Sequence, residues 1–284
     1  MLTLMLASLL GCNGDADPVD TTVDACGPGG DSYTFVMTGM YYTRKDDNGQ
    51  TLGFDLDDHV SDAGDDEGCF KEDAVDPYGN EGIDNQFSVL IPALEAVEPE
   101  VSAVEGLILD SINAGDLLLL FEVSGVHDMD NDECVSVSVF RGEGAPLIGT
   151  DGKLLDHQSF SRSDLPPNST VEQASIVDGA VEVRGLELVL PLMILDVELE
   201  FNIDEAAARL MFDDDGSLSG YFGGGVPLED ILVIADEEDL GATADLIRSV
   251  VPTFADLFPD AGGQCQELSV AFEMDGVPAF FYGE

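Results

Sequence analysis

The feature that most constrains the fold of this chain is a set of two-residue turn signals of the type Asn-Gly or Asp-Gly. They are Asn48-Gly49, Asp151-Gly152, Asp178-Gly179, Asp215-Gly216 and Asp275-Gly276. Between apolar runs such dipeptides indicate β-hairpins, because a type I′ turn needs positive φ at both central residues. All of them except Asp151-Gly152 have apolar flanks on both sides. The sequence therefore predicts four hairpins.

The flanks of these hairpins, and three further runs, supply the predicted strands. The flanks are residues 34–42 and 51–56, 174–177 and 180–183, 210–212 and 218–222, and 270–274 and 279–282. Residues 197–203 alternate apolar with polar side chains, which is typical of a strand with one buried face. Residues 188–195 are apolar but contain Pro191, so they form either two strand ends that meet or an edge strand.

With residues 117–123 and 135–140, the chain has about ten strands separated by tight turns. This pattern predicts a mainly β fold. The favoured architecture is a β-sandwich of the jelly-roll type with antiparallel sheets and a few short helices, and the alternative is a distorted barrel.

Two regions have the apolar spacing of helices instead. Residues 84–114 form the first, which Pro92 and Pro99 divide into short helices. Residues 239–258 form the second. We expect both to cover an end or an open edge of the sheets. The sequence has no linker between domains and no repeat of fixed period, so residues 31–284 are predicted to be a single β-rich domain.

The charge balance excludes whole classes of partner. The chain has 59 Asp and Glu against 9 Lys and Arg, a formal net charge of −50. Nucleic acids are excluded because phosphate contacts need clustered basic residues, and anionic membrane surfaces are disfavoured for the same reason. Three interpretations stay open: a salt-adapted surface, a cation-binding protein, and a surface protein that its charge keeps soluble.

The first residues read MLTLMLASLLGC, an apolar run followed by small residues and Cys12. This segment resembles the signal peptide and lipobox of bacterial lipoproteins, with Leu9-Leu10-Gly11 before the cysteine. The family has basic residues before the apolar run, which residues 2–11 lack, so we expect the true start to lie upstream.

The resemblance implies that residues 1–11 are removed and that Cys12 is lipidated. Residues 12–30 would then be a flexible tether to the membrane of the cell envelope. Asn13 follows the cysteine where an Asp would favour the inner membrane, so the resemblance implies the outer membrane. It says nothing about the folded domain.

The remaining cysteines indicate a disulfide framework. With Cys12 set aside, the chain has Cys26, Cys69, Cys134 and Cys265. An even number in an exported chain predicts two disulfides, with three possible connectivities. Their wide spacing excludes local zinc or redox motifs. Because Cys26 and Cys265 flank the first and last predicted strands, we expect Cys26–Cys265 and Cys69–Cys134.

No motif of an enzyme is present. The sequence contains no GxSxG, HExxH, P-loop or GxGxxG motif. The three histidines, His59, His127 and His157, are scattered, and a solvated loop position is the favoured interpretation for each. The sequence therefore favours a non-enzymatic protein.

Two acidic clusters are the strongest chemical signal. The first begins with Asp55, Asp57 and Asp58 and precedes Cys69; the second contains Asp128, Asp130 and Asp132 and precedes Cys134. Oxygen ligands at alternate positions of a loop can converge on one Ca²⁺ ion. The second cluster is not an EF-hand, because Glu133 and Val139 replace the Gly and Glu that the motif needs.

We therefore predict these six residues as candidate Ca²⁺ ligands, with solvated charged loops as the alternative. A Cys69–Cys134 disulfide would bring both clusters to one site.

These observations favour a lipoprotein domain of the cell envelope with a structural, adhesive or binding role, stabilised by Ca²⁺. Its membrane contact would be the lipid anchor, and its protein or glycan ligand is unknown. The alternative is a carbohydrate-active or other hydrolytic enzyme with paired carboxylates in a β-sandwich cleft. The chain has no Trp, so the sugar-stacking rings would be Tyr41, Tyr42, Tyr78, Tyr221 and Phe222. A third possibility, a carrier of apolar ligands, rests on the apolar run 186–195.

Overall fold

The fold is mainly β, as predicted, with 46% of the residues in strands and 18% in helices. The computed structural model describes Cys26 and residues 29–66, 68–194, 197–236 and 241–282. The predicted signal peptide and Cys12 lie outside the described residues, as does most of the predicted tether.

The strands are β1 (Asp31–Tyr42), β2 (Leu119–Val126), β3 (Asp132–Glu143), β4 (Gln158–Arg162), β5 (Asn168–Val177), β6 (Ala180–Ile194), β7 (Val197–Phe212), β8 (Leu218–Pro227), β9 (Leu257–Pro259) and β10 (Cys265–Tyr282). The helices are α1 (Phe87–Val97), α2 (Val104–Ala114), α3 (Leu228–Asp236) and α4 (Gly241–Val250), with 3₁₀ turns at Pro99–Ala103 and Val251–Thr253.

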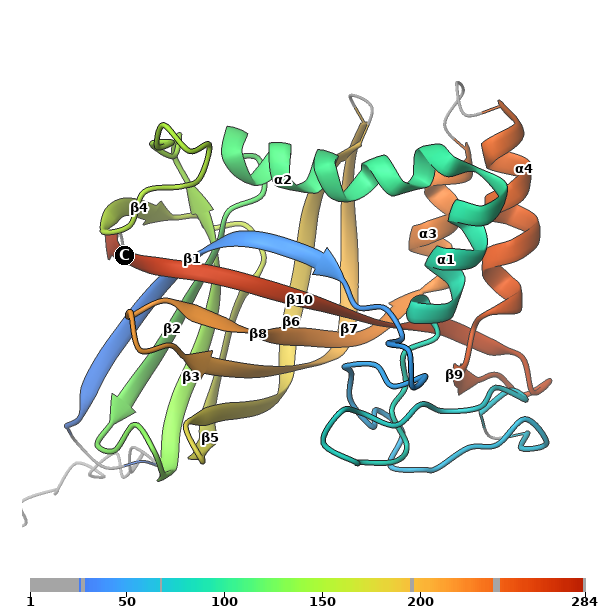
Figure 1. Ribbon diagram of the computed structural model, residues 1–284, viewed down its shortest axis with the longest axis horizontal. Coiled ribbons are helices and arrows are strands. Elements are labelled where there is room, and N and C mark those ends of the chain that lie inside the picture. The colour runs from blue at the N-terminus through green and yellow to red at the C-terminus, as the bar shows by residue number, and fades with distance from the viewer. Residues whose placement is uncertain (1–25, 27–28, 67, 195–196, 237–240, 283–284) are drawn as a thin grey trace, which may run out of the picture.

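Eight of the strands close into an antiparallel barrel, not a jelly-roll sandwich (Figure 1). The order around the barrel is β1-β2-β3-β5-β6-β7-β8-β10, and β10 pairs with β1 to complete the ring. The short strand β4 runs parallel to β10 and antiparallel to β3, and β9 pairs with β10. Closure leaves few unpaired edges, which is how an antiparallel sheet of this size avoids edge-to-edge association.

Two of the four predicted hairpins are confirmed and two are wrong. Asp178-Gly179 joins β5 to β6, and Asp215-Gly216 joins β7 to β8. Asn48-Gly49 makes a turn in a long loop, but no strand follows it. Asp275-Gly276 lies inside β10, where Gly276 pairs with Met37 of β1 and Leu218 of β8. Pairing with two neighbouring strands keeps the chain extended there, against its local preference for a turn.

Strand β6 runs unbroken through Pro191, and its pairing explains how. Its register with β7 extends along the whole strand, whereas β5 pairs only with residues Ala180–Glu182. Pro191 therefore lies on a stretch of edge, where its missing N–H costs no ladder hydrogen bond. On β7 the predicted alternation is confirmed at Ile203, which is buried, and Glu200, which is exposed.

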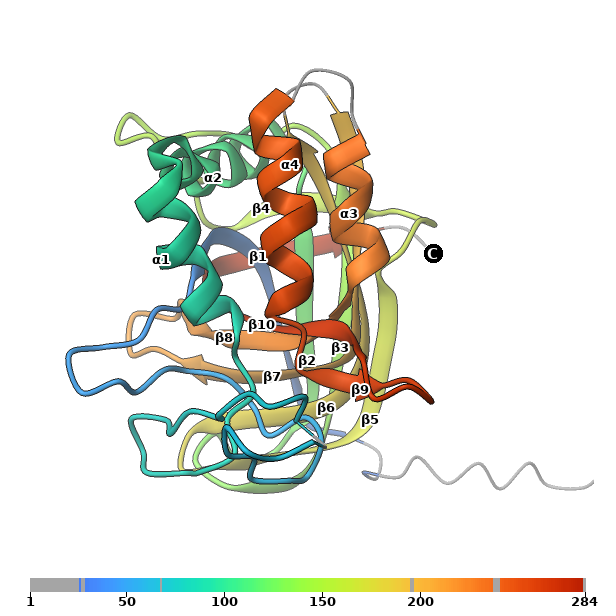
Figure 2. The same cartoon turned by 90° about the vertical axis from the view of Figure 1, so that its right-hand side faces the viewer.

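The helices cover the barrel in two places. Helices α1 and α2 occupy the first region of helical spacing, and α2 lies across the top of the barrel in Figure 1, against β1 and β6. Its Ile108 and Ile112 join the single hydrophobic core. Figure 2 shows α1, α4 and α3 side by side.

Within residues 239–258, predicted as one helix, α4 ends at Val250 and Leu257 begins β9 instead, because it pairs with Glu267. No helix among the described residues is long and apolar enough to cross a membrane.

Two disulfides are present, but the expected pairing is wrong. Cys26 bonds to Cys134 and Cys69 bonds to Cys265. The expected pair Cys26–Cys265 rests on the positions of these cysteines beside the first and last predicted strands. These strands are neighbours, but they are antiparallel, so that Phe35 near the start of β1 pairs with Pro278 near the end of β10. Cys265 therefore lies at the far end of the β1–β10 pair from Cys26.

The disulfide Cys69–Cys265 is expected to support much of the chain's stability. It closes a loop of 196 residues and fastens the irregular segment 43–86 to β10. Replacing both cysteines by Ser should lower the free energy of unfolding by about 2–5 kcal/mol, measured by urea unfolding followed by circular dichroism.

Peptide mapping under non-reducing conditions checks the connectivity itself. It should recover the pairs Cys26–Cys134 and Cys69–Cys265, and a peptide that links Cys26 to Cys265 would contradict the structure.

Candidate metal centre

Three acidic side chains converge in the segment 43–86, whose described residues form no helix or strand. They are Asp55, Asp57 and Asp84, whose ligand atoms all lie within 4.8 Å of one another. The backbone explains the convergence, because Phe54 and Asp84 form an antiparallel bridge. Directly after this bridge the chain bends at residues 56–58, and the Leu56 amide donates a hydrogen bond to Asp84 Oδ2, so the carboxylates of Asp55 and Asp57 come beside Asp84.

The neighbours of this trio hold it against the barrel. The ring of Phe54 packs 5.1 Å from that of Tyr221 on β8. Asp84 is only 3% exposed, and its Oδ2 accepts a hydrogen bond from the Leu56 amide at 2.7 Å. The side-chain amide of Asn85 donates to Thr43 Oγ1 at 2.6 Å and also to the Leu52 carbonyl. Asp84 is thus fixed at the base of the segment.

Burial raises the free energy of a carboxyl group when it is charged, and so raises its pKa. Burial, together with the nearby carboxylates of Asp256, Asp57 and Asp73, raises the pKa of Asp84 to about 9. Asp256 is also buried, and desolvation raises its pKa to about 7 although Ser269 donates two hydrogen bonds to it. Burial also raises the pKa of Asp73. The site therefore disfavours the charged form of these groups and favours a bound proton in its place.

Among the described residues no Lys or Arg forms an ion pair with the trio, although the nearby His59 acts to lower the pKa of Asp57, which burial raises. None of the ion pairs there involves Asp55, Asp57 or Asp84. The Arg184 guanidinium donates to the Asp55 backbone carbonyl at 2.7 Å. Asp55 Oδ1 is buried and has no hydrogen-bond partner within the described part of the chain. A buried carboxylate oxygen in this state is stabilised by a bound proton or by a cation.

The backbone of Gly82 leaves space for the carboxylate of Asp55. A Cβ at Gly82 would lie 3.3 Å from Asp55 Oδ2 and 3.2 Å from the His59 carbonyl oxygen. The residue also has a φ of +79°, which a glycine adopts without strain. A side chain here would crowd the trio.

The donors are all hard oxygens, which are the ligands of Ca²⁺ and Mg²⁺ and not of soft transition metals. Two oxygens on opposite sides of a Ca²⁺ ion lie about 4.6–5.2 Å apart, from Ca–O distances of about 2.3–2.6 Å. The spacing of the trio is therefore compatible with one shared ion. Asp55, Asp57 and Asp84 could hold a metal ion.

The structure brings together two of the six predicted ligands. Asp55 and Asp57 belong to the trio, whereas Asp58 does not and has a φ of +58°. Sequence reasoning missed Asp84, because it lies far along the chain and only the bridge to Phe54 places it here. A signal existed in its polar neighbours, since Asn85 and Gln86 follow it before an apolar helix.

The second acidic cluster forms a turn between β2 and β3. Asp132 Oδ2 accepts a hydrogen bond from the His127 amide at 2.7 Å, and Asp128 Oδ1 accepts one from the Asp130 amide at 2.8 Å. Asp128, Asp130 and Asp132 form no group of potential metal ligands in the described ranges. Since Cys69 bonds to Cys265, the disulfide that would have joined the two clusters does not exist.

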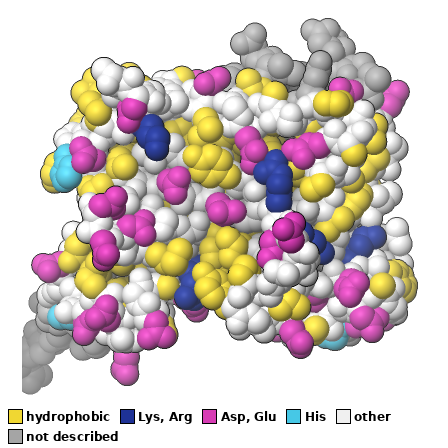
Figure 3. Space-filling view, in the orientation of Figure 1, with side chains coloured by type: hydrophobic (Ala, Val, Ile, Leu, Met, Phe, Trp, Pro, Cys, Tyr) yellow, Lys and Arg dark blue, Asp and Glu magenta, His cyan; other side chains and the backbone are white. Residues whose placement is uncertain are grey.

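Of the three histidines, His59 lies beside the trio, because its backbone amide donates a hydrogen bond to Asp57 Oδ1 at 2.9 Å. His59 Nε2 is 2.7 Å from Asp65 Oδ2, and His127 and His157 each lie near an Asp of their own loop. Figure 3 shows the other acidic side chains spread over the visible face, with few Lys or Arg among them. Acidic side chains on this face are therefore in contact with water, whereas Asp84 of the trio is buried.

The raised pKa of Asp84 makes a specific prediction for the metal-free chain. A group with a pKa of about 9 in the folded state and 3.8 as its ordinary value binds protons more tightly when folded. Stability should therefore fall as the pH rises from 6 to 9, by at most about 1.4 kcal/mol per pH unit for one group. Urea unfolding in EDTA across this range measures the slope.

The variant Asp84→Asn should flatten that slope between pH 7 and 9, because the amide carries no charge at any pH. The variant Asp130→Asn, at an exposed position in the other acidic cluster, should keep it. Equal slopes in Asp84→Asn and the unmodified chain would show that Asp84 does not titrate in this range.

Comparison with known proteins gives no assignment. No protein-family model, no curated protein and no solved structure matches the chain. The function is therefore inferred from the residues of this chain alone.

Proposed function

We propose that this chain is an exported, lipid-anchored domain of the cell envelope with a structural or binding role that depends on bound Ca²⁺. The observation that carries the proposal is the convergence of Asp55 and Asp57 on the buried Asp84. A bound divalent cation would neutralise carboxylates that otherwise have to take up protons or repel one another. It would also fasten the segment 43–86 to the barrel.

Ca²⁺ is favoured over Mg²⁺ for two reasons. Ca²⁺ accepts irregular sets of oxygen ligands, whereas Mg²⁺ demands near-octahedral geometry and gives up its waters reluctantly. Extracellular modules also bind Ca²⁺ with weak affinities, which a site with few protein ligands can reach. The residues that would hold the ion are Asp55, Asp57 and Asp84, with Asp73 beside them.

Several observations support export and anchoring. The two disulfides are typical of oxidising compartments, outside the reducing cytosol. The lipobox-like segment that ends at Cys12 supplies an anchor. The net charge of −50 would keep a surface protein dispersed and would attract divalent cations.

Ca²⁺ is expected to stabilise the folded chain directly. At a free concentration several hundred times its Kd, the gain should be roughly 3–4 kcal/mol in the free energy of unfolding. The measurement compares urea unfolding in EDTA with unfolding in millimolar CaCl₂, both at high NaCl so that general charge screening is constant. The gain should increase between pH 6 and pH 8, because Ca²⁺ competes with the proton on Asp84.

The matched variants are Asp57→Asn and Asp130→Asn, one from each acidic cluster. Asp57→Asn should abolish most of the Ca²⁺ effect, whereas Asp130→Asn should retain it. Equal responses from the two variants, or no response of the unmodified chain, would overturn the metal assignment. Stabilisation by MgCl₂ equal to that by CaCl₂ would overturn the choice of ion.

The anchor is tested separately. In a bacterial host, the full-length chain should partition into the detergent phase of a Triton X-114 extraction and carry a lipid on Cys12 by mass spectrometry. The variant Cys12→Ser should move to the aqueous phase. A full-length chain that stays aqueous and unmodified would contradict the lipoprotein proposal and would leave the Ca²⁺ site unaffected.

A further inference from the structure

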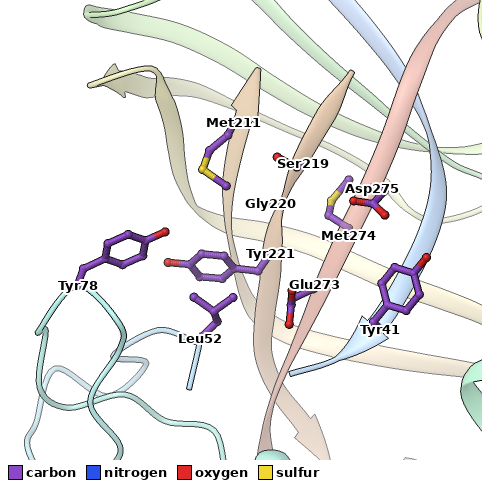
Figure 4. Close-up of a pocket in the computed structure, with 10 residues that line it drawn as sticks. All are labelled: Tyr41, Leu52, Tyr78, Met211, Ser219, Gly220, Tyr221, Glu273, Met274 and Asp275. Atoms are coloured by element: carbon purple, nitrogen blue, oxygen red, sulfur yellow. The ribbon is translucent and has the colours of Figure 1, made fainter. Parts of the chain in front are cut away.

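A pocket outside the barrel gathers three tyrosines and two carboxylates. It has a volume of about 220 Å³ and is lined by Tyr41, Leu52, Tyr78, Met211, Ser219, Gly220, Tyr221, Glu273, Met274 and Asp275. Figure 4 shows Tyr41 and Tyr78 on opposite sides, with Tyr221 and Glu273 between them. The residues come from β1, β7, β8 and β10, and from the segment 43–86.

Strand alternation explains why these side chains share the outer face. Their neighbours Tyr42, Phe222 and Phe272 belong to the hydrophobic core. Successive side chains of a strand point to opposite faces, so Tyr41, Tyr221 and Glu273 face outward. The barrel wall forms the floor of the pocket, and Leu52 and Tyr78 come to it from the segment 43–86.

The ring of Tyr41 occupies the space that a side chain at Gly39, on the same strand, would fill. A Cβ at Gly39 would lie 2.7 Å from the Tyr41 hydroxyl and 2.8 Å from its ring carbon Cε2. The ring therefore lies over the bare backbone of Gly39. Tyr221, on the floor of the pocket, is only 4% exposed, and its ring is backed by Phe54. These two aromatic groups are positioned before any ligand arrives.

The carboxylates have no cation of their own. None of the ion pairs among the described residues involves Glu273 or Asp275. Burial raises the pKa of Glu273, and the neighbouring charges of Asp275 and Glu105 raise it further. Glu105 is already paired with Arg44, so the excess charge lies with the other two groups.

Aromatic faces and unpaired carboxylates together select a particular kind of ligand. Tyrosine rings attract cations through the ring quadrupole, best when the cation is weakly hydrated. A cation–π contact is already present beside the pocket, where the Arg209 guanidinium lies 5.4 Å from the centroid of Tyr78. Met211 and Leu52 add apolar contacts that suit methyl groups. The volume is below the range of about 300–1,000 Å³ for drug-sized ligands.

We propose that this pocket binds a small organic cation that carries an alkylated ammonium group. Its charge would be balanced by Glu273 and Asp275, and its methyl groups would contact Tyr41, Tyr78 and Tyr221. This binding site goes beyond the proposed Ca²⁺ role and stands on different residues.

The probe is choline, titrated into the full-length chain in a nonionic polyoxyethylene detergent, which has neither a sugar nor a choline headgroup. Binding is followed by ligand-detected NMR. The chain has no Trp, so quenching of tyrosine fluorescence gives an independent signal. The neutral isostere 3,3-dimethyl-1-butanol has the same shape without the charge, and it should bind at least about tenfold more weakly.

Two variants test the walls of the pocket. Glu273→Gln combined with Asp275→Asn should weaken choline binding at least about tenfold. Tyr78→Leu should weaken it about 3- to 30-fold, since one ring face is lost. The matched control is Tyr282→Leu, because Tyr282 is 59% exposed against 60% for Tyr78 and lies outside the pocket. It should bind choline as the unmodified chain does.

Thermal unfolding shows whether each variant folds. If the double variant does not fold, the Tyr78→Leu variant alone tests the proposal. Equal binding of choline and its neutral isostere would overturn the proposal. So would tighter binding of a monosaccharide such as glucose, which would assign the pocket to carbohydrate.

Because Leu52 and Tyr78 share a segment with Asp55 and Asp57, the titration is run in EDTA and in CaCl₂. Choline binding in either condition supports the pocket. Its absence in both, at tens of millimolar choline, overturns this proposal, whereas the Ca²⁺ proposal fails only if CaCl₂ does not stabilise the fold.

Discussion

The pairing of β10 with both β1 and β8 is the interaction on which the rest of this structure depends. It turns a meandering antiparallel sheet into a closed ring. Closure gives the wall two faces with different roles. The inner face buries the hydrophobic core, and the outer face of β1, β8 and β10 carries the tyrosines and carboxylates of the pocket. It also gives the segment 43–86 a firm surface to fold against.

Where the segment 43–86 and the following elements pack against the barrel, some acidic side chains are buried away from water. Most acidic side chains stay on the surface, where physiological salt screens them over about 8 Å. Asp84 and Asp256 are exceptions, because each is almost completely buried. A folded chain tolerates such groups only as neutral acids or beside a cation. The geometry of Asp55 and Asp57 beside Asp84 makes the second state available.

A feature of this fold could be predicted from the sequence where neighbouring residues specify it, and could not where distant residues decide it. The turns Asp178-Gly179 and Asp215-Gly216 are specified by two residues and their flanks, and both are present. Asp275-Gly276 has the same local signal, but the partners of Gly276 on two other strands decide its conformation. The number of disulfides could be predicted from the number of cysteines. Their connectivity could not, because it depends on the direction of β1 relative to β10.

The metal trio illustrates the same limit. Asp55 and Asp57 lie two positions apart in the sequence and are predicted there as ligands, whereas Asp84 joins them only through a bridge between distant residues. The pocket tyrosines were recognised as candidate stacking residues. Their shared position on the outer face, beside Glu273 and Asp275, required knowledge of which strands are neighbours.

The connectivity of the disulfides has a consequence for how the chain reaches this state. The bonds Cys26–Cys134 and Cys69–Cys265 interleave, so each one skips the next cysteine along the chain. A polypeptide that enters an oxidising compartment N-terminus first exposes Cys26 and Cys69 before their native partners arrive. No bond between consecutive members of these four cysteines is native. Any such bond that forms first has to rearrange by thiol–disulfide exchange before the native pairs can form.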